Sequence, residues 1–355
     1  MYLYENKMWN DDVSEVIKLN QWIKEYEGKS VLITGATGGV CSAMVDILIK
    51  NNEVVNNPTE IYVAGRSFEK MKNRFGKYTK ENFFHFVEFD ATDGKLNIDK
   101  NIDFMIHGAS NSSPDMLEKE PVETLLENVI GMYGILKYGK KHEVVRILYV
   151  SSSEIYGKLD YDGCRKEDQY GKTDLLIPRN AYAIGKQAGE NMCVSFSKEY
   201  QIDTVIVRPG HIYGPTMSAN DKHVSSQWAY NASQGSDIIM KSSGSQVRSY
   251  CHCLDCASAI LAVLLKGERC KAYNVSNPNS VISIKQLAQI LSEYSNVELK
   301  VETPSYKEVQ RFNPMSNSSL DSTELLKLGW NCIFDAKNGL EHTVNILREI
   351  KSELS

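Results

Sequence analysis

Two residues that together could move a proton lie four positions apart in the segment NAYAIGKQAGE, residues 180–190. At this spacing Tyr182 and Lys186 share one face of a helix. A phenol with an ordinary pKa of about 10 is a poor base near neutral pH, and a neighbouring ammonium stabilises its phenolate. The spacing alone is weak evidence, because Tyr133 and Lys137 repeat it. Only the segments around each pair distinguish them.

A cluster of hydroxyl groups ends the predicted strand that precedes Tyr182. In the segment YVSSSEIYG, Ser152 or Ser153 could bond a substrate oxygen and hold it against the tyrosine, and Glu154 could add a second acid or base. The alternative for these serines is a turn capped by its own hydroxyl groups. Tyr133 lies instead in a helical segment between two predicted strands. The predicted catalytic residues are therefore Tyr182, Lys186, Ser152, Ser153 and Glu154.

The segment VLITGATGGVCSAM, residues 31–44, predicts a strand, a glycine-rich turn and the start of a helix. Such a turn lets the backbone approach a dinucleotide pyrophosphate and aims helix N–H groups at it. The alternative is a glycine-rich loop with no ligand. Cys41 stands where a third small residue normally permits close helix-to-strand packing, so the motif is weakened but kept. The predicted coenzyme contacts in this loop are Gly35, Thr37, Gly38, Gly39 and Val40.

The end of the second predicted strand, IYVAGRSFEK, indicates which coenzyme is bound. It has no acid for a ribose 2′-hydroxyl, and Arg66 could bind a 2′-phosphate, so NADP(H) is favoured and NAD stays possible. The alternative is a solvated Arg66, because Gly35 to Arg66 exceeds the usual spacing of about 20 residues. Asp90, with Ala91 after it in VEFDATD, could contact the adenine or cap the next turn.

These residues need a parallel sheet to position them, and the chain predicts one. Apolar runs at 31–33, 61–63, 84–89, 104–106, 147–150 and 204–207 alternate with segments of helical periodicity. The predicted fold is α/β, a Rossmann-type doubly wound parallel sheet with a smaller C-terminal substrate-binding lobe over the carboxyl ends of its strands. We expect a helical extension at 1–28 with a helix over 12–27, a coenzyme domain at 29–215 and a lobe mostly from 216–355. Later helices are predicted at 283–294 and 336–351, and some later segments return to the sheet.

Composition excludes several classes of partner. The 355 residues carry 40 Lys and Arg against 45 Asp and Glu, a net charge of -5, so no broad basic field attracts nucleic acid or an anionic membrane. No secretory signal and no apolar run long enough for a membrane span occur, so we expect a cytoplasmic protein. Its eight cysteines are then expected to be free thiols.

One cysteine cluster, residues 251–256 in RSYCHCLDCASAI, invites a zinc assignment. The segment predicts a strand that runs into a helix at Asp255. Cys251 and Cys253 would then point to one face and His252 to the other, and no second CxxC pair completes a tetrahedron. We expect buried thiols at Cys251, Cys253 and Cys256, and no metal.

Taken together, the motifs resemble the extended short-chain dehydrogenase/reductase superfamily, whose epimerases, dehydratases, decarboxylases and reductases act on nucleotide-linked sugars. The resemblance covers about residue 28 to the C-terminus. Its motifs, quoted from this chain, are TGATGGVCS, the HGAS of 107–110, Asn128 in ENVIGMYGIL, SSSEIYG, YAIGK, the RPGHIYGP of 208–215 and the GSQVRSY of 244–250.

The resemblance implies roles for matched positions. Ser152 falls at the catalytic Ser/Thr, Tyr182 and Lys186 at the catalytic pair, and Asn128 at the asparagine that supports the active-site helix. Arg248 falls where an arginine commonly grips the substrate diphosphate. Helices around 118–140 and 181–200 match those of the family's homodimer interface. Further coenzyme contacts are expected at Gly108, Ala109, Ser110 and Pro209, and further substrate contacts at Asn111, Ser153 and His211, although a packed role for His211 is equally open.

The reaction is harder to predict than the family. The run TMSANDKHVSSQW, residues 216–228, together with SSSEIYG resembles UDP-glucuronate decarboxylases, and Glu154 is also found in dehydratases. Arg66 favours net reduction with NADPH, as in reductases that convert CDP-linked keto sugars to activated alditols for capsule or wall polysaccharides. We expect such a reductase. The alternative is a closed-cycle NAD-dependent decarboxylase, epimerase or dehydratase, and a third possibility is a non-catalytic NADP-sensing module.

Overall fold

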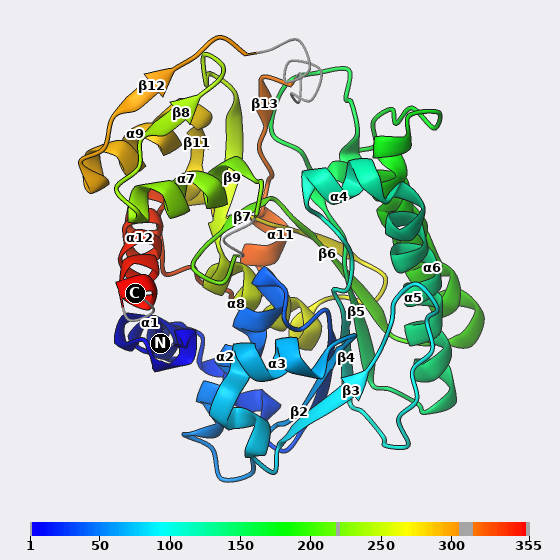
Figure 1. Ribbon diagram of the computed structural model, residues 1–355. Helices are drawn as coiled ribbons and strands as arrows, with labels where there is room; N and C mark the ends of the chain where they lie inside the picture. Colours follow the sequence, from blue (N-terminus) through cyan, green and yellow to red (C-terminus); the bar gives the residue numbers. More distant parts are fainter. Residues whose placement is uncertain (1, 218–220, 305–314, 353–355) are drawn as a thin grey trace.

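A computed structural model describes residues 2–217, 221–304 and 315–352. Its main layer is a seven-stranded parallel sheet in the order β10-β6-β5-β4-β1-β2-β3 (Figure 1). All six predicted strands are present, and a seventh joins them from much later in the chain. The strands are β1 (Ser30–Thr34), β2 (Glu60–Gly65), β3 (Phe84–Glu88), β4 (Phe104–His107), β5 (Arg146–Val150), β6 (Thr204–Pro209) and β10 (Ala272–Val275).

Helices cover both faces of this sheet, which is why the strand residues are apolar on both sides. One face packs against α2 (Gly39–Asn52) and α8 (Cys253–Lys266). The other packs against α5 (Pro121–Lys141) and α6 (Ala181–Tyr200), which lie side by side. Shorter helices are α3 (Phe68–Phe75), α4 (Pro114–Lys119) and α11 (Thr323–Leu326). The doubly wound α/β class is thus confirmed.

A four-stranded mixed sheet and a separate two-stranded sheet form a second layer above the strand ends (Figure 1). Here β9 (Val247–His252) pairs with β7 (His211–Tyr213), β11 (Val281–Ser283) and β13 (Asn317–Ser318), and β8 (Ile238–Met240) pairs with β12 (Leu299–Val301). Three amphipathic helices, α7 (Val224–Ser233), α9 (Ile284–Ser295) and α12 (Ala336–Ser352), enclose its core. Between β9 and β11 the chain returns to the large sheet through α8 and β10, so the two layers are interleaved along the sequence.

The N-terminal extension differs from the single helix predicted over 12–27. It consists of α1 (Lys7–Leu19) and a 3-10 helix (Gln21–Tyr26), separated at Asn20. The Asn20 side chain donates to the Val16 carbonyl at 3.2 Å and accepts from the Asn331 backbone N–H at 3.0 Å. An asparagine that bonds nearby backbone groups in this way ends a helix, so the predicted helix is interrupted at Asn20. The predicted start was also wrong, because the Asn6 side chain accepts from the Trp9 N–H and caps α1 there.

Polar contacts fasten this extension to both layers. The Trp9 indole is buried and donates to Asp46 of α2 at 3.0 Å, and Asp46 also pairs with Arg74. Asp12 pairs with His342 of α12 at 3.0 Å. Since α2 begins at the glycine-rich turn and α12 belongs to the smaller layer, the extension connects the two.

The cysteine cluster lies at the junction of β9 and α8. The helix begins at Cys253, two residues before the predicted start, because the His252 ring accepts from the Leu254 N–H. Cys251, Cys253 and Cys256 are fully buried free thiols. Asp255, also buried, accepts from the backbone N–H groups of Ile333 and Phe334. Within the described residues no three His, Cys, Asp or Glu side chains are grouped to hold a metal ion.

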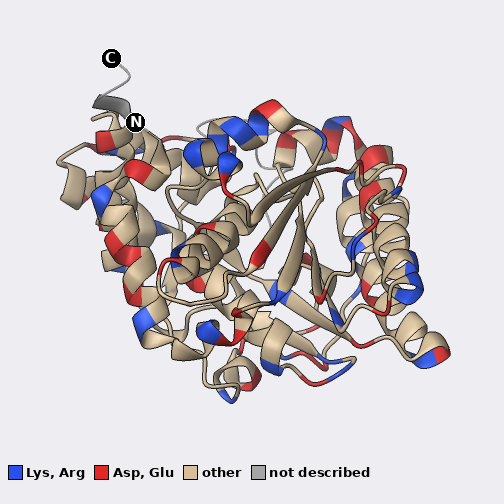
Figure 2. Cartoon of the chain, turned by 90° about the horizontal axis from the view of Figure 1, so that it is seen from below, with Lys and Arg blue, Asp and Glu red and all other residues tan. Residues whose placement is uncertain are grey.

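Charged residues of both signs are scattered over the outer helices and loops in the view from below (Figure 2). This distribution agrees with the small net charge. Over the described ranges, every helix is too short or too polar to cross a bilayer.

We expect Trp9→Ala to lower the free energy of unfolding by about 3 to 5 kcal/mol, because a buried aromatic side chain is removed from a packed site. Trp9→Phe retains most of the packing but loses the bond to Asp46, so about 2 kcal/mol is expected. Chemical denaturation measures both. A loss below about 1 kcal/mol for Trp9→Ala would show that the extension is not part of the folded core.

Candidate active site

A cleft of about 860 Å³ lies between the carboxyl ends of the large sheet and the smaller layer. The glycine-rich turn forms one wall, the segment after β5 and the start of α6 form a second, and α7 and β9 form a third. The predicted residues that line it are Gly35, Gly38, Gly39, Val40, Gly108, Ser110, Ser152, Ser153, Glu154, Tyr182, Lys186, Pro209, His211 and Arg248. The topology therefore gathers segments that are far apart in the sequence, at the position where doubly wound sheets bind ligands.

At Gly35 the glycine-rich turn lies very close to the backbone of Gly108 and Ala109. Gly35 has φ +65°, and a Cβ there would lie 2.8 to 2.9 Å from backbone atoms of Gly108 and Ala109. Only glycine fits both the conformation and the space. Gly38 is the N-cap of α2, so the first N–H groups of that helix point out of the turn. Thr37 is exposed beside them and does not line the cleft.

Cys41 is accommodated by the glycine that faces it. Its thiol is buried in the first turn of α2, and a Cβ on Gly108 would come within 2.4 Å of the sulfur. The close contact between α2 and the sheet is thus kept, because Gly108, directly after β4, leaves room for the Cys41 side chain. Thr34 strengthens this junction by accepting from the backbone N–H groups of Gly108 and Ala109, each at 3.1 Å.

Tyr182 and Lys186 both emerge from the first turns of α6 into the cleft. The ammonium of Lys186 lies 5.6 Å from the Tyr182 ring centre and donates to the Val150 carbonyl at 2.7 Å. Burial lowers the pKa of Lys186 to about 7, and the negative Glu127 and Glu190 oppose that shift. This lysine is therefore poised between its charged and neutral forms near physiological pH.

The Tyr182 phenol is held in its neutral form. Burial is the main cause of a raised pKa, and the negative charge of Glu154 adds to it. The Ser152 hydroxyl and the positive Arg179 act in the opposite direction. A cation close to the ring would be needed to make this phenol a base, since its surroundings otherwise favour the protonated form.

The serine cluster forms a capped turn, and Ser152 and Ser153 also line the cleft. Ser152 Oγ accepts from the Glu154 N–H at 3.2 Å and so caps the 3-10 turn Ser153–Tyr156, yet it also lines the cleft. Ser151 Oγ is buried and has no hydrogen-bond partner among the described residues. Glu154 forms a paired interaction with Arg179, at 2.6 and 3.0 Å. A polar group of a ligand would form the hydrogen bond that the Ser151 hydroxyl lacks.

Asn128 lies between α5 and the active-site helix. Its amide donates to Ser110 at 2.9 Å and accepts from the Tyr149 hydroxyl at 3.0 Å. A Cβ on Gly185 of α6 would lie 3.0 Å from the Asn128 side chain, so the two helices approach closely here. The backbone of Asn111 is held nearby, because its N–H donates to the buried Glu127 of α5 at 2.7 Å.

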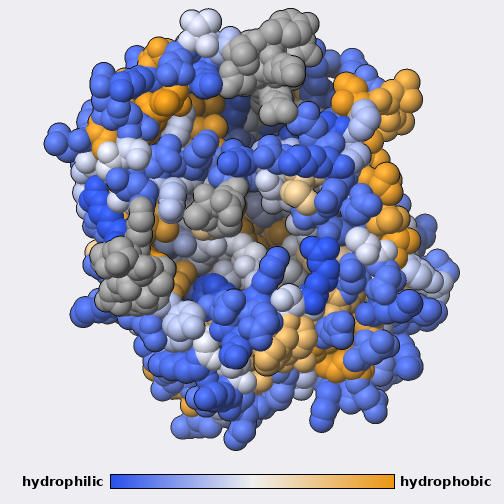
Figure 3. Space-filling view, in the orientation of Figure 1, coloured by the Kyte–Doolittle hydropathy of each residue, from blue (hydrophilic) through white to orange (hydrophobic). Residues whose placement is uncertain are grey.

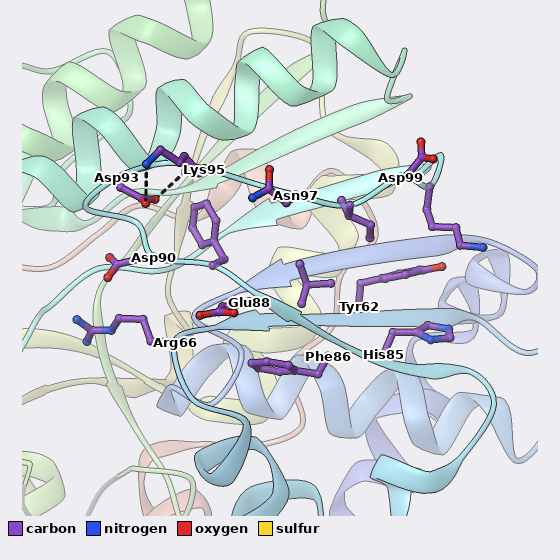
Figure 4. A pocket seen from close by; sticks show the side chains of 14 residues that line it. Tyr62, Arg66, His85, Phe86, Glu88, Asp90, Asp93, Lys95, Asn97 and Asp99 are labelled. Atoms are coloured by element: carbon purple, nitrogen blue, oxygen red, sulfur yellow. Dashed lines mark hydrogen bonds and ion pairs between the residues drawn. The ribbon is translucent and has the colours of Figure 1, made fainter.

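Arg66 and Asp90 lie outside the catalytic cleft, at one end of a second pocket of about 900 Å³ beside the edge strand β3 (Figure 4). Tyr62 and His85 line its other end. Asp90 accepts from the N–H and hydroxyl of Thr92 at 2.9 and 2.8 Å, so it caps the following turn. Its pKa is lowered mainly by the Thr92 N–H bond and also by the positive Arg66. Ala91 is buried next to it.

The substrate side of the cleft contains His211 and Arg248. Burial and the positive Arg248 lower the pKa of His211 to about 3, so this ring is neutral. Its ring packs against Tyr250 with centres 5.7 Å apart. His211 is thus a packed side chain that also reaches the cleft.

Sequence reasoning missed several residues here. Arg179 pairs with Glu154, and Asp221 pairs with His223 at 2.6 Å at the opposite wall of the cleft. Met217 covers Gly39 closely enough that a Cβ there would clash with its sulfur. The signal for Arg179 was its place three residues before Tyr182. The central residues 218–220 of the run TMSANDKHVSSQW lie outside the described ranges.

The fold and the cleft define a dinucleotide-dependent enzyme of the doubly wound α/β class. Residues 31–276 match the NAD dependent epimerase/dehydratase family, so the chain belongs to that family of nucleotide-sugar enzymes. This confirms the family predicted from the motifs.

Individual relatives are more distant. The chain is 27% identical over 331 residues to UDP-glucuronic acid decarboxylase 1 of Xenopus tropicalis, across 93% of this chain and 74% of the relative. An epimerase structure from Methanothermobacter thermautotrophicus aligns with TM-score 0.79 and 20% identity, over 95% of this chain and 97% of the other. UDP-glucuronic acid 4-epimerase from Bacillus cereus, in complex with UDP-glucuronic acid and NAD, aligns with TM-score 0.74 and 19% identity over 90% and 99%. These structures show the fold.

The residues present fit a nicotinamide dinucleotide. The turn at Gly35 and Gly38 offers backbone N–H groups at a helix start, which suits a pyrophosphate. The unpartnered Ser151 hydroxyl and the Lys186 ammonium lie deeper in the same cleft, where ribose hydroxyls would bond them.

We expect Tyr182→Phe to lower turnover by about a hundredfold or more while coenzyme binding is kept, because only the proton-transferring hydroxyl is removed. Tyr133→Phe is the matched control, since Tyr133 has the same Tyr-x-x-x-Lys spacing but is 46% exposed on α5. Steady-state rates and coenzyme titration measure the effects. Near-normal turnover of Tyr182→Phe, or an equal loss in Tyr133→Phe, would remove Tyr182 from the mechanism.

Proposed function

We propose that the protein is a closed-cycle nucleotide-sugar enzyme that decarboxylates a nucleoside-diphosphate-linked uronic acid, with UDP-glucuronate as the first candidate. This replaces the expected CDP-keto-sugar reductase, which no comparison supports. The observation that carries the proposal is the catalytic group Ser152, Glu154, Tyr182 and Lys186 in one cleft of a chain similar over 93% of its length to a UDP-glucuronate decarboxylase.

The chain's own residues divide the acid–base work. Tyr182, as a phenolate stabilised by Lys186, takes the proton of a sugar hydroxyl while Ser152 holds that oxygen. When bound, the nicotinamide coenzyme supplies the reversible oxidation of the sugar. A ketone next to the carbon that bears the carboxylate lets that carbon lose CO₂, because the electron pair of the broken bond passes into an enolate. The enolate carbon takes a proton from solvent. The bound coenzyme would supply the hydride that reduces the ketone, and Tyr182 returns its proton to the sugar oxygen, which completes the cycle.

Glu154 supports this assignment through its pairing with Arg179. The ion pair keeps a carboxylate and a guanidinium at the mouth of the cleft beside Tyr182. A bound uronate would bring a further negative charge to this place, and Arg179 is the cation able to meet it.

The test is incubation of the purified protein with UDP-glucuronate, and in parallel with CDP-, UDP-, GDP- and dTDP-linked sugars. We expect CO₂ and a nucleotide-linked pentose from the uronate with no net change in coenzyme absorbance. Tyr182→Phe serves as the inactive control. Stoichiometric oxidation of NADPH with a keto sugar, and no CO₂ from any uronate, would restore the reductase.

The coenzyme is proposed to be NAD(P), with the choice made at Arg66. Arg66 is exposed at the end of β2, and NAD is bound in a structurally similar family member. If Arg66 reads a 2′-phosphate, NADP(H) is preferred, as the missing acid at this strand end suggests.

We expect Arg66→Ala to raise the dissociation constant for NADPH roughly tenfold or more and to change that for NADH little, because one charge-assisted phosphate contact is lost. Lys70→Ala, an exposed cation nearby on α3, is the matched control. Fluorescence titration with both coenzymes measures this. Equal losses for NADPH and NADH would mean that no 2′-phosphate is bound there.

We also propose a homodimer formed through α5 and α6. Apolar side chains gather over these helices at the right of Figure 3. The exposed ones are Val122, Leu125, Leu126, Tyr133, Val194 and Tyr200. A contiguous apolar surface of this kind is typical of a protein interface.

A further inference from the structure

A buried arginine of β6 contacts both segments that carry the catalytic groups. Arg208 is 2% exposed. Its guanidinium binds the two carboxylate oxygens of Glu190 on α6, from Nε to Oε1 at 3.0 Å and from Nη2 to Oε2 at 2.7 Å. Glu190 is buried as well, so this ion pair is largely shielded from water. The pair fixes α6 to the strand beside it.

The remaining nitrogen of Arg208 reaches the serine turn. Nη1 donates to the Tyr156 hydroxyl at 3.1 Å and to the Glu167 carbonyl at 2.7 Å. Tyr156 is fully buried and ends the 3-10 turn that Ser152 caps. Its hydroxyl donates in turn to the Asn274 amide oxygen at 2.6 Å. One guanidinium group therefore holds α6 and the serine turn in a fixed relation.

Glu190 continues the face of α6 that carries the catalytic pair. Tyr182, Lys186 and Glu190 follow one another at intervals of four residues, so their side chains lie along one side of the helix. All three are buried. A shift of α6 that broke the contact between Glu190 and Arg208 would move the phenol and the ammonium together. Arg208 does not line the cleft, so it acts on the reacting groups only through these contacts.

Ser152 and Tyr182 belong to the two segments that Arg208 joins. Burial has the largest effect on the pKa of Tyr182 and raises it, whereas a hydrogen bond to the Ser152 hydroxyl lowers it. Hydrogen bonds weaken steeply as their distance and angle depart from the preferred values. The separation of the turn from the helix therefore affects how readily the phenol ionises.

A second ion pair on the same two strands offers a comparison. Arg146, the first residue of β5, pairs with Asp203 at 2.8 Å and donates to the Leu264 and Leu265 carbonyls at 3.1 and 3.3 Å. It likewise joins an acid to backbone carbonyls of a helix, but it lies at the amino ends of the strands, away from the cleft. This pair contacts no catalytic segment and supplies a matched control.

We propose that Arg208 is a positioning residue for the catalytic group. Through Glu190 and Tyr156 it sets the distance between the helix that carries the phenol and the turn that Ser152 caps. This rests on the proposed function only in taking Tyr182 as the base. A buried ion pair is weak evidence of a gain in stability, because replacing both partners by apolar groups is often neutral. Holding two catalytic segments together gives the pair a different role.

The first test is steady-state kinetics of the full-length protein with whichever nucleotide-linked sugar it turns over. For the double variant Glu190→Met with Arg208→Met, which leaves no unpaired charge, we expect kcat to fall about tenfold or more and KM and the dissociation constant of NAD to change less than about twofold. Arg208→Lys keeps the charge but not the fork and should lie between. Arg146→Met with Asp203→Asn should keep kcat within about twofold of the wild type, because it alters no contact of the cleft.

The pH profile of kcat separates positioning from a loss of folded protein. The rate rises as Tyr182 ionises, so a weaker bond from the serine should move this acid limb to higher pH by about half a unit or more in the double variant at positions 190 and 208. Loss of folded protein lowers the profile without moving it. The ionisable groups that face the phenol are Glu154, Arg179, Tyr149 and Lys186, and none of them is altered.

An unchanged kcat and acid limb in the double variant would overturn the proposal, as would an equal loss in the Arg146 control. If the double variant does not fold, Arg208→Lys decides by the same two measurements. If UDP-glucuronate is not a substrate, the proposed reaction fails while this test proceeds with another sugar. A crystal structure of the variant needs no turnover: we expect Ser152 Oγ and Tyr182 Oη to lie farther apart than in the wild type, and an equal distance would overturn the proposal.

Discussion

The buried ammonium of Lys186 is the constraint around which the site is arranged. Among the described residues its one hydrogen-bond acceptor is the Val150 carbonyl, and no carboxylate lies at ion-pair distance from it. A lysine in this position loses much of its preference for the charged form, which is why its pKa falls to about 7. Ligand hydroxyls or a neighbouring phenolate would restore that preference, so the state of Lys186 is coupled to what the cleft contains.

The rest of the fold serves to hold this lysine next to the phenol and the glycine-rich turn. The close approach of α6 to α5 at Gly185 sets the depth of Tyr182, and Asn128 fixes the junction because its amide nitrogen donates to Ser110 and its amide oxygen accepts from Tyr149. On the other side of the sheet, Gly35 and Gly108 let the strand ends and α2 approach closely, because neither residue has a side chain to separate them. The space opened at Gly108 is occupied by Cys41, which explains how a departure from the usual glycine pattern leaves the turn intact.

Much of the fold was predictable because parallel strands buried on both faces read as continuous apolar runs. All six predicted strands of the large sheet were observed, and so was the strand expected before the cysteine cluster, which is β9. The strand β10 was missed because Asn274 interrupts its apolar residues, and the other strands of the smaller layer have only two or three residues each. The N-terminal helix was misplaced because its boundary depends on Asn20 bonding to Asn331, a contact across most of the chain. Such long-range polar bonds leave no local pattern.

The same reason explains why only part of the candidate site was predicted from the sequence. Tyr182, Lys186 and the serines were found because each lies within a local motif, and the structure brings them into one cleft. Arg179 belongs to an irregular segment, and its partner Glu154 is brought to it only by tertiary structure. Asp221 and His223 pair with each other, but the segment that contains them has no periodic pattern that would indicate a place in the cleft. The reaction was harder to predict from the sequence than the family, because NADPH-driven reduction and a closed cycle use the same phenol and lysine.

The most direct test of the account is a crystal structure of the protein with NAD and a UDP-linked sugar. We expect the pyrophosphate on the turn at Gly35 and Gly38, a ribose hydroxyl on Lys186, and the Tyr182 hydroxyl about 2.6 to 3.2 Å from a sugar oxygen. A dinucleotide bound away from that turn, or a sugar beyond reach of Tyr182, would contradict it.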